Sequence, residues 1–100
     1  MLKTKESVTV VIASLICSNI KMGKLLIGLD TTLSTIYNWI SGKSWPRGAN
    51  LNNLMQMANI NDIHTNESAI KRIEENPHML VGRAFGNDIE KAIEVLKNNA

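Results

Sequence analysis

Residues 20–43, IKMGKLLIGLDTTLSTIYNWISGK, decide the fold because they contain two short helical patterns separated by a turn. We expect the first helix over Lys21–Leu29, although each of its two glycines weakens it by about 1 kcal/mol relative to alanine. Asp30 and Thr31 are expected to form the turn, since aspartate tolerates left-handed backbone geometry and hydrogen-bonds locally. A second helix is expected over Leu33–Ser41, with Thr32 as its N-cap and Gly42 as the residue that ends it.

The second of these helices has two faces of different chemistry. Ile36, Trp39 and Ile40 fall on one side and are expected to hold the helix to the core. The opposite side carries Leu33, Ser34, Tyr37 and Asn38, which we call the candidate reading face. Asparagine can bond adenine through two hydrogen bonds, serine can reach several bases, and an apolar side chain can meet a thymine methyl group. The two short helices and their tight turn therefore predict helix-turn-helix geometry, with the second helix in the major groove of DNA.

Basic side chains lie close to this pair of helices in the sequence. Lys43 and Arg47 follow the second helix in a loop that contains a proline and a glycine, where they are expected to grip phosphate. Lys21 and Lys24, in the first helix, are assigned to the DNA backbone as well, with a simple solvated face as the alternative.

The pattern Thr32-x-x-Thr35-Ile36-x-x-Trp39-x-x-Gly42-Lys43, followed by Pro46 and then Leu54-x-x-Met57-Ala58, resembles the phage-repressor and Cro-like (XRE-type) helix-turn-helix family. The resemblance extends over residues 8–60 and implies a lambda-repressor-like helical bundle that binds DNA. By position, it places Leu33, Ser34 and Asn38 where the family reads bases, with Tyr37 close by. It places Thr32, Lys43 and Arg47 where the family touches the DNA backbone.

Three departures from the family pattern bear on DNA binding. Met22 stands where many members have a glutamine that bonds phosphate. Asp30 replaces the usual turn glycine, and an acidic group near DNA is unfavourable unless it caps a helix. The interval from Pro46 to Leu54 is longer than usual, which leaves the phosphate contacts of this loop open.

Helical spacing extends over the rest of the chain, so we expect an all-α fold with additional C-terminal helices. An N-terminal helix is expected over Ser7–Ser18 with one apolar stripe, although its β-branched residues make a strand the competing interpretation. Asn50 is expected to cap a helix that carries Leu51, Leu54, Met55 and Ala58. Later helices are expected over Glu67–Glu75, from Asn76-Pro77 to no further than Gly86, and from an Asn87 cap with Glu90 three residues on.

The C-terminal third is expected to mediate dimerisation within the same compact domain. We divide the chain into a DNA-binding region, residues 1–66, and a dimerisation region, residues 67–100. Apolar stripes at Ile70/Ile73 and at Ile89, Ala92, Ile93 and Leu96 exceed what a compact four-helix reader of DNA requires, although part of them must cover the N-terminal helix. Ile89, Ile93 and Leu96 are therefore predicted to form a homodimer interface.

Composition excludes several other classes of protein. At 100 residues the chain makes one domain, and a lone cysteine, Cys17, excludes a disulfide scaffold and a zinc finger. His64 and His78 lack partners at metal-ligand spacing, and no catalytic arrangement or phosphate-binding glycine loop is present. We therefore expect no enzyme, no cofactor and no metal.

Charge and hydropathy bear on partners and location. Residues 1–48 carry six basic and two acidic side chains, whereas residues 49–100 carry five basic and seven acidic ones. A basic half followed by an acidic half suits a DNA-facing half beside a partner-facing half. The apolar run at residues 8–17 is too short to span a bilayer, which takes about 20 residues. It resembles a secretory signal only faintly, so we expect a cytoplasmic protein without membrane contact.

These observations predict a cytoplasmic, sequence-specific transcriptional regulator that binds double-stranded DNA as a homodimer, most simply a repressor from a bacterium, phage or mobile element. One alternative is an antitoxin-like or other protein-interaction module with a protein partner. The other alternative is an architectural or recombination accessory protein that bends DNA.

Overall fold

The computed structural model describes residues 2–99, and within them the chain forms six α-helices, one short 3₁₀ helix and no strand. The all-α class is thereby confirmed. The helices are α1 (Lys5–Ile16), α2 (Met22–Leu29), α3 (Leu33–Ser41), α4 (Ala49–Ile60), α5 (Asn66–Glu75), η1 (Pro77–Leu80) and α6 (Gly86–Asn98).

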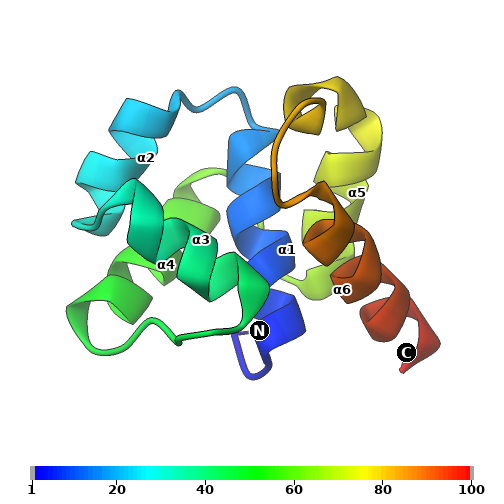
Figure 1. Cartoon of the computed structure of the whole chain (residues 1–100), viewed down its shortest axis with the longest axis horizontal. Helices are drawn as coiled ribbons and strands as arrows, with labels where there is room; N and C mark the ends of the chain where they lie inside the picture. The colour runs from blue at the N-terminus through cyan, green and yellow to red at the C-terminus, as the bar shows by residue number, and fades with distance from the viewer. Residues whose placement is uncertain (1, 100) are drawn as a thin grey trace.

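Helix α1 is the centre of the fold. Figure 1 shows α2, α3 and α4 on one side of it and α5 and α6 on the other, and α1 contacts every one of these helices. Every residue from Ser7 to Cys17 is buried, so the expectation of a single apolar stripe is wrong: Val10 and Ala13 are as inaccessible as Ile12. A helix covered by neighbours on all sides carries mostly apolar side chains around its whole circumference. Its sequence then lacks a polar face, which is why a buried strand is the competing interpretation.

Hydroxyl groups buried in α1 bond to backbone carbonyls. Thr9 is only 3% exposed. Its hydroxyl lies 2.8 Å from Ile40 O in the last turn of α3 and 3.0 Å from Lys5 O. Ser14 donates to Val11 O at 2.7 Å. Thr9 and Ser14 are thus satisfied by backbone carbonyls, and Thr9 also ties α1 to α3. The buried Ser7 hydroxyl instead accepts from the Thr4 hydroxyl at 3.2 Å.

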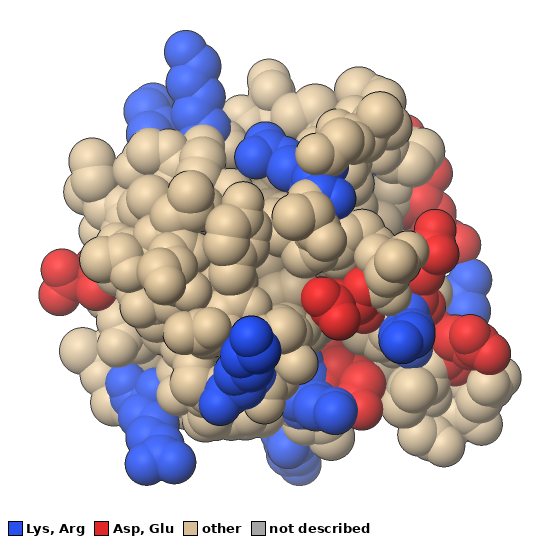
Figure 2. Space-filling model, viewed as in Figure 1, with Lys and Arg blue, Asp and Glu red and all other residues tan. Residues whose placement is uncertain are grey.

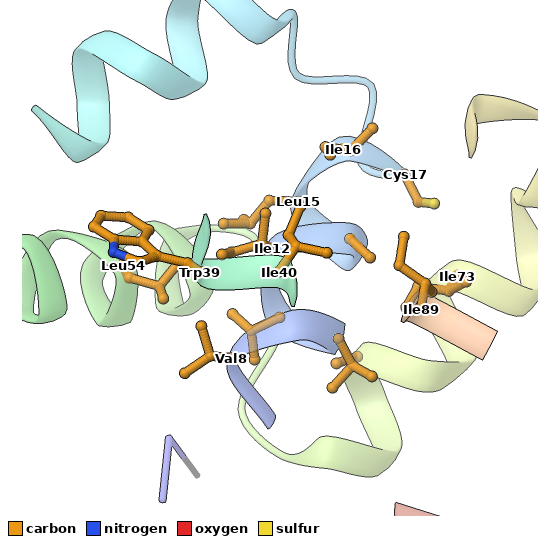
Figure 3. Close-up of a cluster of buried hydrophobic side chains, with 14 of the residues drawn as sticks. Val8, Ile12, Leu15, Ile16, Cys17, Trp39, Ile40, Leu54, Ile73 and Ile89 are labelled. Atoms are coloured by element: carbon orange, nitrogen blue, oxygen red, sulfur yellow. The ribbon is translucent and has the colours of Figure 1, made fainter. Parts of the chain in front are cut away.

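The core continues on both sides of α1. Figure 3 shows Trp39 and Leu54 on one side of the helix and Ile73 and Ile89 on the other, all within one buried cluster. The stripe of α5 and α6 is therefore core rather than surplus: Ile70, Ile73, Ile89 and Ala92 are at most 7% exposed. The prediction that Ile89 faces a second copy is wrong, because α1 presents apolar side chains to α6 and Ile89 fills that contact.

Arg72 on α5 joins the two halves of the bundle. Its Nη2 donates to Asn61 O at the end of α4 (2.9 Å), and its Nη1 donates to Ser18 Oγ just after α1. Charged donors form the stronger protein hydrogen bonds. Arg72 therefore fixes α5 against the ends of two helices, a role that no local pattern in the sequence indicated.

Several predicted helix caps and lengths differ from the structure. Helix α4 begins after Gly48, not after an Asn50 cap, because Gly48 adopts a positive φ of 54° that only glycine reaches easily. Asn87 lies inside α6, whose N-cap position is Phe85 and has no side-chain cap. The helix expected after Asn76-Pro77 is only the four-residue η1, and Gly82 then turns the chain with a φ of 81°.

Within residues 2–99 no helix is long and apolar enough to cross a membrane.

Candidate nucleic-acid interface

The corner between α2 and α3 is built by two residues with local roles. Asp30 closes α2 in the left-handed region (φ 53°), and its N–H donates to Ile27 O at 3.1 Å. Thr32 then caps α3, since its hydroxyl accepts from the Thr35 N–H at 3.3 Å. Both the predicted turn and the predicted N-cap are confirmed, because each depends on residues within a few positions of one another.

Asn50 on α4 holds this corner from outside. Its side-chain amide donates to Leu29 O at 2.8 Å and to Asp30 O at 3.2 Å, the carbonyls where α2 ends. Gly28 faces the Met57 side chain of α4, which would have to move if Gly28 carried a Cβ, since that Cβ would lie 2.8 Å from Met57 Sδ. The direction of α3 relative to α2 is thus tied to α4, and this is what Asn50 does in place of capping.

Helix α3 buries one face and exposes the other, as its sequence predicts. Ile36, Trp39 and Ile40 are at most 3% exposed. On the candidate reading face, Leu33 is 40% and Tyr37 38% exposed, Ser34 is exposed, and Asn38 is half-buried. The Asn38 side-chain amide makes no hydrogen bond to any residue between 2 and 99, so both its donor and its acceptor are available to a ligand.

The end of α3 leads directly into the loop that carries Lys43 and Arg47. Gly42 stops the helix in the left-handed region (φ 80°), as predicted, and the Lys43 N–H donates to Asn38 O at 2.9 Å. Lys43 is therefore fixed by its backbone one turn beyond the candidate reading face. Arg47 is exposed further along the same loop, beside the buried Pro46.

Charge is unevenly distributed around the exposed face of α3. Lys21 and Lys24 are exposed at the start of α2, and α2 and α3 themselves contain no acidic side chain, although the exposed Asp30 lies in the turn between them. Figure 2, in the view of Figure 1 with α3 in front, shows basic side chains around the rim of this face and most acidic ones gathered over α5 and α6. The face of α2 and α3 is thus the part of this surface best suited to a polyanion.

A contact that sequence reasoning missed borders the candidate reading face. The rings of Tyr37 and Phe85 lie with centroids 5.4 Å apart and planes tilted by 52°. Both residues, with Asn38, Lys43 and Asp88, line a hollow of about 170 Å³ between α3 and the start of α6. Asp88 places a carboxylate at this edge, which disfavours phosphate there. Only the rarity of aromatic residues in the chain could have drawn attention to Phe85.

The remaining candidate dimer residues lie at the outer edge of α6. Ile93 and Leu96 are partly buried and pack against the core. Val95, which is 39% exposed, lines a separate hollow on the side of α6 that faces α1 and the end of α3. A groove of about 450 Å³ runs between α5 and α6 and is lined by Ile70 and Leu96 together with charged side chains. The surface left for a partner is therefore smaller than the sequence predicts.

In the part of the chain that the structure describes, groups with reactive or metal-binding chemistry do not gather into a site. Burial raises the pKa of the Cys17 thiol from 9.0 to about 11, so this cysteine is protonated and unreactive near neutral pH. His64 bonds Asn59 Oδ1 at 3.3 Å, and His78 is exposed in η1. Among residues 2–99 no three His, Cys, Asp or Glu side chains cluster as metal ligands would.

Comparison with known proteins finds no matching family model, no matching curated protein and no matching solved structure. The resemblance to the helix-turn-helix family therefore stays a prediction that rests on the residues quoted above.

Proposed function

We propose that this chain is a sequence-specific DNA-binding regulator in which α2 and α3 form a helix-turn-helix unit within a lambda-repressor-like bundle. The observation that carries the proposal is the exposed face of α3. It holds Leu33, Ser34, Tyr37 and Asn38 on a helix that is anchored by three buried side chains and lacks any acidic residue. Side chains of these types suit the base edges of the major groove.

In the proposed complex, the N-terminal half of α3 enters the major groove and α2 crosses the DNA backbone. The free amide of Asn38 bonds an adenine, and Leu33 meets a thymine methyl group. Thr32 lies at the start of α3 and is expected to lie beside the DNA backbone. Its hydroxyl already accepts a hydrogen bond from Thr35 in the helix cap.

Phosphate contacts come from the basic side chains around this face. Lys43 and Arg47 follow α3, and Lys21 and Lys24 start α2, so the two pairs flank the groove from opposite ends of the unit. Phosphate contacts fix the orientation of the protein on the duplex and supply affinity that falls as salt concentration rises. They do not distinguish one base sequence from another.

A two-fold dimer completes the proposal. One reading helix of nine residues contacts a short half-site, and two linked half-sites bind far more tightly than one. We place the interface at the outer edge of α6, where Ile93 and Leu96 are only partly buried and leave some apolar surface exposed. Half-sites are then expected about 34 Å apart on a palindromic operator, which the protein occupies in the cytoplasm.

A protein partner is the second candidate, as for an antitoxin-like module. The groove between α5 and α6 favours it, because it combines apolar walls with the acidic and basic side chains Glu67, Lys71 and Lys97. A partner seated there would leave α3 free for DNA. The two candidates are separated by whether the purified chain alone selects a DNA sequence.

The test is selection of bound sequences from random duplex DNA with three proteins: wild type, Asn38→Ala and Asn98→Ala. Asn98 is exposed at the end of α6, far along the chain from the candidate reading face, and serves as the matched control. We expect wild type and Asn98→Ala to enrich the same motif. Asn38→Ala should stay folded and lose about 1–3 kcal/mol of discrimination at one base position. Absence of any enriched motif for wild type would contradict the proposal.

A further inference from the structure

The contact between Tyr37 and Phe85 links the exposed face of α3 to the C-terminal helices. The two rings come from positions 48 residues apart, with centroids at 5.4 Å and a tilt of 52°. This is the offset, tilted arrangement that aromatic pairs favour. Tyr37 is 38% exposed, whereas Phe85 is only 3% exposed. One ring therefore faces solvent while the other forms a buried wall behind it.

Phe85 is itself rigidly placed. It occupies the N-cap position of α6, where its carbonyl accepts from the Ile89 N–H at 3.2 Å. Ile89 is 2% exposed and belongs to the core around α1, as does Phe85. The wall against which Tyr37 rests is thus fixed by the packing of α6 on α1, not by α3.

We propose that Phe85 is a positioning residue that sets the direction of Tyr37 on the candidate reading face, so that the C-terminal helices take part in sequence discrimination. The inference rests on the proposed function. An exposed tyrosine on a helix surface has several accessible rotamers, and each must be abandoned when the ring meets a base. A ring already held against Phe85 loses this freedom in the free protein, so its contact with DNA is preorganised.

The direction of the Tyr37 ring also affects its neighbour Asn38. Both line the hollow of about 170 Å³ that Phe85 and Asp88 close from the other side. If the Tyr37 ring swings away from Phe85, it moves within the space next to the Asn38 amide. Phe85 therefore governs a base contact without touching DNA itself.

The experiment compares Phe85→Leu, Tyr37→Leu and the double variant with wild type, using the full chain. Tyr37 is the sole tyrosine, so its ring protons give one assignable set of nuclear magnetic resonance signals in every variant that retains it. Base preference is measured on duplexes carrying single changes to the selected motif, and the salt dependence of binding is measured in parallel. The control is Ile63→Val, a substitution in the core between α4 and α5.

We expect Phe85→Leu to move the Tyr37 ring signals toward those of an unstacked tyrosine. Discrimination should fall about tenfold at the base pair that Tyr37→Leu affects, which is within the range of one base contact. The double variant should discriminate no worse than Tyr37→Leu alone, and the salt dependence should not change. Ile63→Val should alter stability but neither the ring signals nor the base preference.

Unchanged ring signals, or unchanged discrimination in a folded Phe85→Leu protein, would overturn the inference. Phe85→Met, which keeps a large apolar side chain without a ring, takes the place of Phe85→Leu if that variant does not fold. Unstacked ring signals in wild type would also overturn the inference, whatever the DNA result. If wild type selects no sequence, the proposed function fails, and Phe85 then has no discrimination to govern.

Discussion

Replacement of Asn50 by alanine tests whether α4 holds the corner between α2 and α3. The substitution removes two hydrogen bonds, to Leu29 O at 2.8 Å and to Asp30 O at 3.2 Å. A protein hydrogen bond contributes about 0.5–1.5 kcal/mol net. The bond to Leu29 is partly buried and counts nearly in full, whereas water replaces much of the exposed bond to Asp30. The loss is therefore about 1–2 kcal/mol.

An opposing effect reduces this loss. Alanine is a better helix former than asparagine by up to about 0.7 kcal/mol, and Asn50 lies in the first turn of α4. The net destabilisation is then about 1 kcal/mol, which lowers Tm by about 4–8 °C in a domain of this size. Asn52 is the matched control, because it lies in the same helix, is exposed and makes no side-chain hydrogen bond to residues 2–99. Asn52→Ala should leave Tm unchanged or raise it slightly.

Thermal unfolding followed by circular dichroism measures both variants, and DNA affinity is measured at a temperature where each is folded. We expect Asn50→Ala alone to lose stability and to bind its selected DNA sequence more weakly, since α3 is less firmly directed. Equal Tm values for the Asn50→Ala and Asn52→Ala proteins would refute the reasoning.

Other consequences of the structure can be measured separately. Lys43→Gln and Arg47→Gln should each lower the slope of log affinity against log salt by about one without changing the preferred sequence, whereas Lys71→Gln on α5 should not. Leu96→Asp should convert a dimer to a folded monomer in sedimentation experiments, because Leu96 lies only partly buried at the edge of the core; a folded variant that stays dimeric places the interface elsewhere. The pKa of Cys17 rises from 9.0 to about 11 on folding, so the unfolded chain releases a proton first and stability should fall as pH rises from 9 to 11. Denaturation of Cys17→Ala across this range should show a smaller fall, and an equal fall would exclude the thiol as its cause.

Local signals allowed α2 and α3 to be predicted closely from the sequence. Thr32 caps α3 and Gly42 ends it, as expected, because a cap and a stop depend on residues within one turn. The start of α2 differs by one residue, at Met22 rather than Lys21. The split between the buried and the exposed side of α3 also followed from helical spacing alone.

Tertiary contacts account for what the sequence did not reveal. Asn50 looks like a helix cap in isolation, but the approach of α4 to the end of α2 gives its amide two carbonyl partners. The apolar stripe of α6 looks surplus in the sequence, but α1 is buried on every side and Ile89 belongs to the core that covers it. The Tyr37–Phe85 contact joins residues from distant helices, and no spacing rule relates them.

The central claim is that α3 reads DNA through its exposed face, and amide chemical-shift mapping tests it most directly. The ¹⁵N-labelled chain is titrated with the selected duplex and with a duplex of the same composition in scrambled order. We expect the largest shift changes at Leu33, Ser34, Tyr37 and Asn38 with the selected duplex, and smaller changes limited to the basic residues with the scrambled one. Changes confined to α5 and α6, or identical changes with both duplexes, would contradict the claim.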